Sequence, residues 1–357
     1  MPGILLLALT LFVAFANGAN DVSKGIATLV GSGVANYRRA VAWGSLCTVA
    51  GALAAAFASQ ALVATFSGKD ILVRPMTSTG FLLAIAAGAI GWLIIATRTG
   101  MPVSTTHSLA GGLIGAALVQ AGADGVLWSA LATKIALPLM ASPVMAFVLL
   151  LIVLPLLRPL IARFDRYCVC VEQTTAVTPD GLMFRDGMPL VEVGSTQSCS
   201  TAVARVSVID SLHWLSAGAT SFFRGLNDTP KILALGVTAA MTLGISRLPQ
   251  YALVALAMGI GSIVAGRRVT RTLAEKVTHI APSNGFAANL VTSLLVGAAS
   301  RFALPVSTTH VSSGAIVGVG LSHRDVRWKI VGEMLVAWLV TLPVSGLIAA
   351  GAYSLMR

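Results

Sequence analysis

The sequence predicts an all-α membrane protein made of two related halves, and three observations support this fold class. Apolar residues make up 56% of the 357 residues and charged residues only 10%, a composition typical of polytopic membrane proteins. The hexapeptide Pro-Val-Ser-Thr-Thr-His occurs at 102–107 and again at 305–310, an offset of 203 residues. A second repeated segment carries Asn20-Asp21 in the first copy and Asn227-Asp228 in the second, at an offset of 207. Repetition in the same order at about half the chain length indicates a duplicated unit.

Long uncharged segments predict the membrane-spanning helices, because about 20 apolar residues cross a bilayer as a helix. They are rich in Ala and Gly, which favours close packing between helices. Such segments occupy 40–68, 75–97, 135–157, 248–266, 277–300 and 334–356.

The basic residues lie mainly at the ends of these segments, where the positive-inside rule expects them. The net charge of +11 therefore does not indicate nucleic-acid binding, and no basic stripe with interleaved aromatic residues is present. The first short loop carries Arg38 and Arg39, whereas its counterpart in the second half carries only Arg247. The next loop reverses this bias, with Lys69 and Arg74 in the first half and four basic residues in the second: Arg267, Arg268, Arg271 and Lys276.

This reversal predicts that corresponding loops lie on opposite sides of the membrane. We therefore expect a polytopic bundle of two inverted-topology repeats, with discontinuous helices or re-entrant hairpins. By the charge bias the N-terminus is outside and the segment that joins the halves is cytoplasmic. About ten crossings result if every motif helix spans the membrane, and fewer if they form hairpins.

The chain divides into a first transmembrane repeat at 1–157, a soluble cytoplasmic insert at 158–210 and a second transmembrane repeat at 211–357. The insert is richer in acidic residues than its neighbours, and its Asp186-Gly187 pair between two apolar stretches predicts a small β-hairpin. Its cysteines, Cys168, Cys170 and Cys199, match no zinc-site spacing. We expect neither a metal site nor a disulfide there, because the cytoplasm is reducing.

Asn20-Asp21 and Asn227-Asp228 place a carboxylate well inside each apolar stretch. An ionised side chain in the bilayer costs a few kcal/mol and is by default functional. The simpler explanation is that these residues only cap or kink a helix, which the nearby glycines and Pro230 also favour. Recurrence of the carboxylate at Asp21 and Asp228 favours a functional role.

The hexapeptide predicts the start of a short helix, with its proline in the first turn. Backbone N–H groups and the Ser and Thr hydroxyls then converge at the positive end of the helix dipole, which suits an anion. The alternative is that Ser and Thr simply join packed helices. Two copies favour the binding site. His107 and His310 have two open interpretations, a proton relay or a structural hydrogen bond to a backbone carbonyl.

These paired motifs around an insert resemble the PiT family of inorganic phosphate transporters, and the resemblance covers nearly the whole chain apart from the insert. It implies a central site for phosphate and its coupling cations between inverted repeats. The implied coupling-ion residues are Asp21 and Asp228. The implied substrate-binding residues are Asn20, Ser104, Thr105, Thr106, Asn227, Ser307, Thr308 and Thr309.

One departure concerns the first motif, which in the family runs Gly-Ala-Asn-Asp-Val-Ala-Asn-Ala. Lys24 and Lys231 replace its later asparagine in the two halves. A lysine three residues after an aspartate can lie on the same helical face and neutralise it. We hypothesise that the lysines, together with His107 and His310, tune the charge of the site, so that coupling is to protons or is weak. Alternatively, the lysines reach the membrane interface and only help packing.

The expected function is secondary active transport of inorganic phosphate across the cytoplasmic membrane by alternating access, coupled to protons or sodium. Sulfate or another tetrahedral oxyanion is the alternative substrate, and a passive anion channel is a further alternative. No nucleophile and base, nucleotide loop or metal spacing suggests an enzyme. The expected partners are phosphate, membrane lipid and the coupling cation, with no other cofactor and no nucleic acid, and a homodimer is left open.

Overall fold

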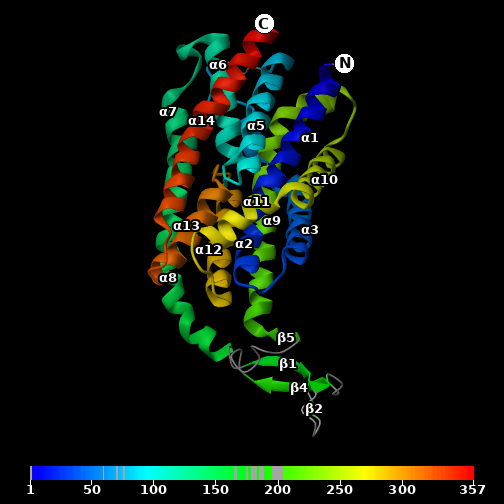
Figure 1. Ribbon diagram of the computed structural model, residues 1–357. Helices are drawn as coiled ribbons and strands as arrows, with labels where there is room; N and C mark the ends of the chain where they lie inside the picture. The colour runs from blue at the N-terminus through cyan, green and yellow to red at the C-terminus, as the bar shows by residue number, and fades with distance from the viewer. Residues whose placement is uncertain are drawn as a thin grey trace.

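The computed structural model describes residues 2–58, 60–69, 71–74, 77–164, 167–173, 176–177, 183–184, 189–194 and 204–357, and helices dominate it (Figure 1). The helices of the first half are α1 (Pro2–Asp21), α2 (Ser23–Gly31), α3 (Tyr37–Ala58), α4 (Gln60–Phe66), α5 (Thr79–Thr99), α6 (Thr105–Ala121), η1 (Ala123–Gly125), α7 (Trp128–Leu131), η2 (Ala132–Ala136) and α8 (Leu137–Phe164). Those of the second half are α9 (Val208–Thr242), α10 (Arg247–Ala265), α11 (Arg267–Arg271), η3 (Thr272–Lys276), α12 (Pro282–Arg301), α13 (Thr308–Ser322) and α14 (Trp328–Met356).

The described residues contain six helical segments that are long and apolar enough to cross a membrane. They are α1 with α2, α3, α5, α7 with α8, α10 and α14. The predicted all-α membrane bundle is therefore confirmed. On α8 and α14, exposed Met140, Leu156, Leu339 and Leu347 suit contact with lipid tails rather than with protein.

Long helices of each half pack against helices of the other half. The first long helix of each half packs against the second long helix of the other, as α1 against α10 and α9 against α3. The last helix of each half packs against the hexapeptide helix of the other, as α14 against α6 and α8 against α13. Figure 1 shows both termini at one end of the bundle, whereas α9 starts at the opposite end, next to the strands. This arrangement supports a duplicated unit, while the inverted orientation in a membrane stays a prediction.

Helices α5 with α6 and α12 with α13 each form a helical hairpin whose two arms pack together. The loop of the first hairpin, Gly100 to Ser104, is mostly buried, and so is Val306 to Ser307 in the second. α6 has 17 residues and α13 has 15, which is short for a free-standing span. The hairpins therefore bring two helix N-termini into the protein interior.

Close approach of helices explains the glycine in each Asn-Asp motif. A Cβ on Gly18 would lie 2.0 Å from the carbonyl oxygen of Met258 in α10, and one on Gly225 would lie 2.2 Å from that of Thr48 in α3. Any larger residue would push these helices apart. The glycines thus serve packing, where the sequence suggested a weakening of the helix.

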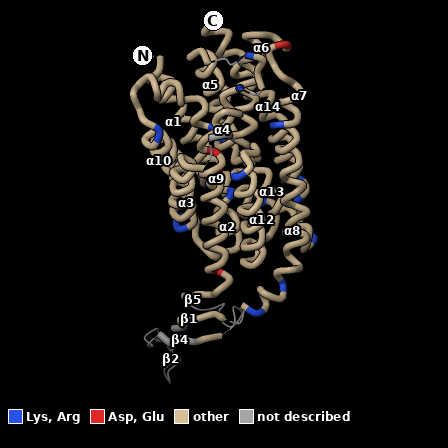
Figure 2. Tube along the Cα trace, turned by 180° about the vertical axis from the view of Figure 1, so that it is seen from behind, with Lys and Arg blue, Asp and Glu red and all other residues tan. Residues whose placement is uncertain are grey.

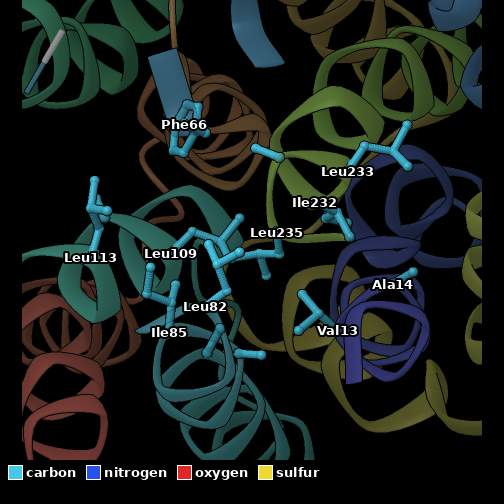
Figure 3. Close-up of a cluster of buried hydrophobic side chains, with 14 of the residues drawn as sticks. Val13, Ala14, Phe66, Leu82, Ile85, Leu109, Leu113, Ile232, Leu233 and Leu235 are labelled. Atoms are coloured by element: carbon cyan, nitrogen blue, oxygen red, sulfur yellow. The ribbon is translucent and has the colours of Figure 1, made fainter. Parts of the chain in front are cut away.

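The largest apolar cluster lies between the two halves (Figure 3). Val13 of α1, Ile85 of α5, Leu109 of α6 and Ile232 of α9 are all buried in it. Because lipid is as apolar as these side chains, dense packing rather than water exclusion stabilises their contact. The cluster therefore joins helices of both halves.

The insert projects from one end of the bundle as a small sheet (Figure 1). Its strands are β1 (Cys168–Gln173), β2 (Ala176–Val177), β3 (Met183–Phe184), β4 (Pro189–Gly194) and β5 (Ala204–Ser207). Because α8 continues to Phe164 and α9 begins at Val208, the described sheet is shorter than the predicted insert. All pairs are antiparallel, in the order β4-β1-β5, with β2 and β3 as a separate pair.

Two expectations for the insert are wrong. β3 and β4 flank Asp186-Gly187, which lies outside the described residues, but they pair with β2 and β1 instead of with each other. Long-range pairing overrides the local turn signal here. Cys170 is disulfide-bonded, whereas we expected reduced cysteines, and Cys199 lies outside the described residues.

Figure 2 shows Lys and Arg at both ends of the bundle and along its outside, with a few charged positions of both signs near its middle. The charged residues of the repeated segments are almost fully buried: Asp21, Lys24, Arg224, Asp228 and Lys231.

Candidate functional site

The two hexapeptides form equivalent helix starts. Ser104 is the N-cap of α6 and its Oγ accepts a hydrogen bond from the His107 N–H at 3.2 Å. Ser307 caps α13 in the same way, with the His310 N–H at 3.2 Å. The serine is a favourable N-cap because it satisfies one N–H group that lacks a partner in the first turn. Pro102 therefore precedes the N-cap. The sequence analysis expected it in the first turn of the helix, and that expectation is wrong.

The hairpin tips touch across the interface between the halves. The Thr309 hydroxyl donates to the carbonyl oxygen of Val103 at 2.7 Å, and the Thr106 hydroxyl donates to that of Val306 at 3.4 Å. Thr106 and Val103 correspond to Thr309 and Val306 at the hexapeptide offset of 203. Ser104 and Ser307 are each 1% exposed. The predicted meeting of two helix N-termini inside the protein is thus present.

The first-half carboxylate lies at a helix break, since α1 ends at Asp21 and α2 begins at Ser23. Asp21 Oδ1 is 2.7 Å from Lys24 Nζ, and both side chains are almost fully buried. Thr105 of α6 donates to Asp21 Oδ2 at 3.2 Å. The lysine therefore neutralises the aspartate across the helix break, and the interfacial alternative for Lys24 is wrong because its side chain is buried.

Asn20 ties this break to the first hairpin tip. Its Nδ2 donates to Thr97 and to the Met101 carbonyl, and its Oδ1 accepts from Lys24 Nζ and from the Val103 N–H. These contacts use both hydrogens and both lone pairs of the amide. In this conformation, Asn20 positions the site, and direct substrate binding by it stays a prediction.

The second half keeps its helix unbroken, because α9 runs from Val208 to Thr242 with Pro230 inside it. The Thr229 hydroxyl donates to the Gly225 carbonyl at 2.8 Å within that turn. Continuity here contradicts the expected break, and packing of α9 against α3 and α12 accounts for it. The motif's sequence thus does not by itself dictate a break.

Lys231 links the second carboxylate to the hairpin tips. Its Nζ lies 3.2 Å from Asp228 Oδ1, 2.8 Å from Thr106 Oγ1 and 2.9 Å from the Val306 carbonyl oxygen. Asn227 Nδ2 also donates to Asp228 and to Val306. At 1% exposure, Lys231 does not reach an interface either.

Two residues that we did not predict complete the centre. Asn17 Nδ2 contacts Asp21 Oδ2 at 2.9 Å, Thr105 Oγ1 at 2.9 Å and Asp228 Oδ2 at 3.2 Å, so that one amide joins both halves. Arg224, its counterpart at the offset of 207, donates to Asn17 Oδ1 at 3.3 Å. The sequence offered a signal for this role, because Arg224 aligns with Asn17 in the repeat and is the one Asp, Glu, Lys or Arg residue between 211 and 227.

His107 and His310 lie side by side, with ring centroids 4.6 Å apart. The Leu139 carbonyl can only accept, so the His310 Nδ1 that lies 3.0 Å from it carries the hydrogen. The His310 ring also packs against the Trp338 ring at an interplanar angle of 32°, and the Trp338 indole N–H donates to the Pro102 carbonyl. The geometry therefore favours the structural interpretation for His310.

The other predicted residues also lie at the tips. Thr105 is the first residue of α6 and Thr308 the first of α13, and both are buried. Helix N-termini, hydroxyls and ammonium groups together can hold a tetrahedral oxyanion. The geometry brings all the sequence-predicted site residues into one buried region.

Comparison with known proteins gives a family match. The model described as the phosphate transporter family matches residues 17–349. A relative in Rhizobium meliloti (strain 1021), described as "Probable low-affinity inorganic phosphate transporter", is 30% identical over 98% of this chain and 94% of its own length. A Bacillus subtilis (strain 168) protein with the same description is 29% identical over 99% and 97%. A solved structure titled "The sodium-dependent phosphate transporter" has a TM-score of 0.79 at 23% identity, covering 99% and 98% of the two chains, and so shares the fold.

Proposed function

This chain belongs to the phosphate transporter family, and from that premise we propose that it carries inorganic phosphate by alternating access, as a secondary active transporter coupled to a cation. It is a transporter and not an enzyme. Curated relatives that it matches over nearly their whole length are described as low-affinity inorganic phosphate transporters. Phosphate is therefore the substrate to test first.

One observation carries the proposal, namely that two helix N-termini meet inside the bundle beside buried ammonium groups. α6 and α13 both start at the interface between the halves, and their tips exchange hydrogen bonds. Each N-terminus contributes unpaired N–H groups and a partial positive charge. A tetrahedral oxyanion between them would contact Ser104 to Thr106 and Ser307 to Thr309.

The coupling cation is the second part of the proposal, and we favour the proton. Lys24 Nζ already occupies Asp21 Oδ1 at 2.7 Å, and Lys231 Nζ lies 3.2 Å from Asp228 Oδ1. A sodium ion would compete with an ammonium group for the same carboxylate oxygen. The fixed ammonium groups therefore support weak or absent sodium coupling.

Alternating access requires contacts between the halves that can open and close again. Polar contacts across the centre are individually modest, since a hydrogen bond contributes about 0.5–1.5 kcal/mol net and one to a charged group about 1.5–3 kcal/mol. They include Asn17 to Asp228, Lys231 to Thr106 and Thr309 to Val103. Because the motif side chains are almost fully buried here, the structure supports an occluded carrier rather than a channel.

We also propose the cytoplasmic membrane, with the N-terminus outside and the insert in the cytoplasm. Exposed basic residues lie in and next to the loop between α13 and α14, namely Arg324, Arg327 and Lys329, and Figure 1 shows this loop toward the end of the bundle that carries the insert. The disulfide at Cys170 argues for the opposite side, since disulfides are rare in the cytoplasm. Protease cleavage of a site added to the insert, in right-side-out and inside-out vesicles, decides between the two.

The direct test uses purified protein in proteoliposomes and labelled phosphate. We expect accumulation above equilibrium when a proton gradient is imposed, and little change when choline replaces sodium. Competition by arsenate but not by sulfate would identify phosphate as the preferred oxyanion. Steep dependence on sodium at constant pH would contradict the proton proposal, and non-saturable current without accumulation would identify a channel. Empty liposomes and liposomes carrying the Asp21→Asn variant are the controls.

A further inference from the structure

The centre of the protein contains an uneven number of buried charges. Among the side chains that the structure describes, five Asp, Lys or Arg residues are at most 2% exposed, and no Glu is: Asp21, Lys24, Arg224, Asp228 and Lys231. Three cationic groups therefore face two carboxylates, and the network carries a net charge of +1. Burying an unbalanced charge is costly, so a bound anion stabilises this network.

The unbalanced charge comes from one half only. At the offset of 207, Lys231 corresponds to Lys24 and Asp228 to Asp21, but Arg224 corresponds to the neutral Asn17. Each lysine contacts its own aspartate. Removing the arginine from this comparison leaves two neutral pairs, so Arg224 alone sets the sign of the centre.

Arg224 is held close to both carboxylates without contacting either directly. It donates to Asn17 Oδ1 at 3.3 Å and to Thr48 Oγ1 at 2.6 Å. Asn17 in turn donates to Asp21 and Asp228. The Nε of Arg224 is buried and has no hydrogen-bond partner among the described residues. A buried cationic donor that lacks a partner is costly and points to a ligand that completes it.

We propose that Arg224 determines the charge of the transported oxyanion, by making the centre neutral when it holds one monovalent tetrahedral anion and no metal cation. The inference rests on the proposed transport of phosphate and names the form carried, dihydrogen phosphate. A divalent anion such as sulfate leaves the centre at −1 and requires an additional cation. The proton that dihydrogen phosphate carries is then the coupled cation.

The test compares wild-type protein with Arg224→Gln and with Arg224→Lys, which keeps the charge and serves as the matched control. Each is reconstituted in proteoliposomes and supplied with labelled phosphate or labelled sulfate. Uptake is measured in sodium medium and in choline medium, at pH values below and above the pKa for the second ionisation of phosphate. Elution as a single species in detergent verifies folding.

For the wild type we expect uptake in choline that falls as the pH rises through that ionisation, and no sulfate uptake. Arg224→Gln makes the empty centre neutral, so a bound monovalent anion now needs a cation. We expect its uptake in choline to fall about tenfold or more, as for loss of a buried charge, and sodium or acid to restore part of it. Arg224→Lys keeps the charge and should therefore retain clearly more uptake in choline than Arg224→Gln, with no added need for sodium.

Equal loss by Arg224→Gln in every medium, or equal behaviour of the Gln and Lys variants, would overturn the inference while phosphate transport stands. Sulfate uptake by the wild-type protein, or dependence of its phosphate uptake on sodium, would overturn the inference as well. These wild-type measurements test the inference even if Arg224→Gln does not fold. If the wild-type protein takes up no phosphate, the proposed function fails and the inference fails with it.

Discussion

The Thr309 hydroxyl donates to the carbonyl oxygen of Val103 at 2.7 Å and so joins the tip of the second hairpin to the tip of the first. Its counterpart from Thr106 to Val306 is longer, at 3.4 Å. Thr106 also accepts from Lys231 Nζ at 2.8 Å. The two tips therefore form one contact that is symmetric in sequence and asymmetric in strength.

Replacing Thr309 by Val should lower the stability of the observed conformation by about 1 kcal/mol, since the Val103 carbonyl loses a buried partner. Thr309→Ser keeps the hydroxyl and should stay close to wild type. Thermal unfolding in detergent measures both. An unchanged melting temperature for Thr309→Val would mean that this contact does not hold the tips together.

Replacing Asp21 or Asp228 by Asn should abolish accumulation of phosphate. Each change leaves a lysine ammonium group buried without its carboxylate, which is strongly destabilising. To separate stability from function, the pair Asp228→Asn with Lys231→Gln removes both charges together and should fold. We expect this double variant to bind lipid and elute normally but not to accumulate phosphate. Wild-type accumulation by both single variants would contradict the site assignment.

Replacing His310 by Asn tests the two interpretations of the histidine pair. The Asn side-chain amide can donate to the Leu139 carbonyl from the position of His310 Nδ1. We therefore expect His310→Asn to keep uptake and its pH profile, while His310→Leu loses about 1–3 kcal/mol of stability because that carbonyl is left unpaired. A flattened pH profile in His310→Asn would instead identify a proton relay.

Replacing Gly18 by Ala should destabilise the bundle by about 1–3 kcal/mol, since overpacking forces the backbone to shift. The added Cβ would lie 2.0 Å from the carbonyl oxygen of Met258. Gly332 in α14 has no atom within 4 Å of such a Cβ, so Gly332→Ala is the matched control and should stabilise slightly or be neutral. The two melting temperatures in detergent decide this prediction.

Asp325, in the loop before α14, provides a pH test outside the membrane-spanning helices. The His279 backbone N–H donates to its Oδ2 at 3.0 Å and Thr278 donates at 3.4 Å, which lowers the pKa of Asp325 below its usual 3.8. Because the pKa is lower in the folded protein, the stabilisation is complete above the unfolded-state pKa and is lost as pH falls through the folded-state pKa.

Hydrogen exchange at the His279 amide should therefore stay slow at neutral pH and quicken only in strong acid, after correction for the intrinsic rate. Asp325→Ala should quicken it at neutral pH, whereas Asp124→Ala, at the other end of the bundle, should not. Equal exchange in Asp325→Ala and wild type would show that the carboxylate does not hold this loop.

The all-helical membrane bundle, the duplication and the two motif pairs were predictable from the sequence, because each depends on local properties. The length of an apolar segment predicts a spanning helix, identity at a constant offset predicts a repeat, and a lysine three residues after an aspartate predicts an ion pair, as between Lys24 and Asp21. Helix starts at the hexapeptides were predictable as well, because Ser104 and Ser307 are favourable N-caps in any context.

Tertiary structure alone decided how these pieces combine. Pro230 lies in an unbroken helix because neighbouring helices hold α9, and β4 pairs with β1 because strand pairing depends on distant partners. Arg224 joined the site only when folding brought it to Asn17 across the two halves. Spacing along the chain determines which residues share a helical face, whereas packing between helices determines which faces meet, and the net charge of the buried centre follows from the second.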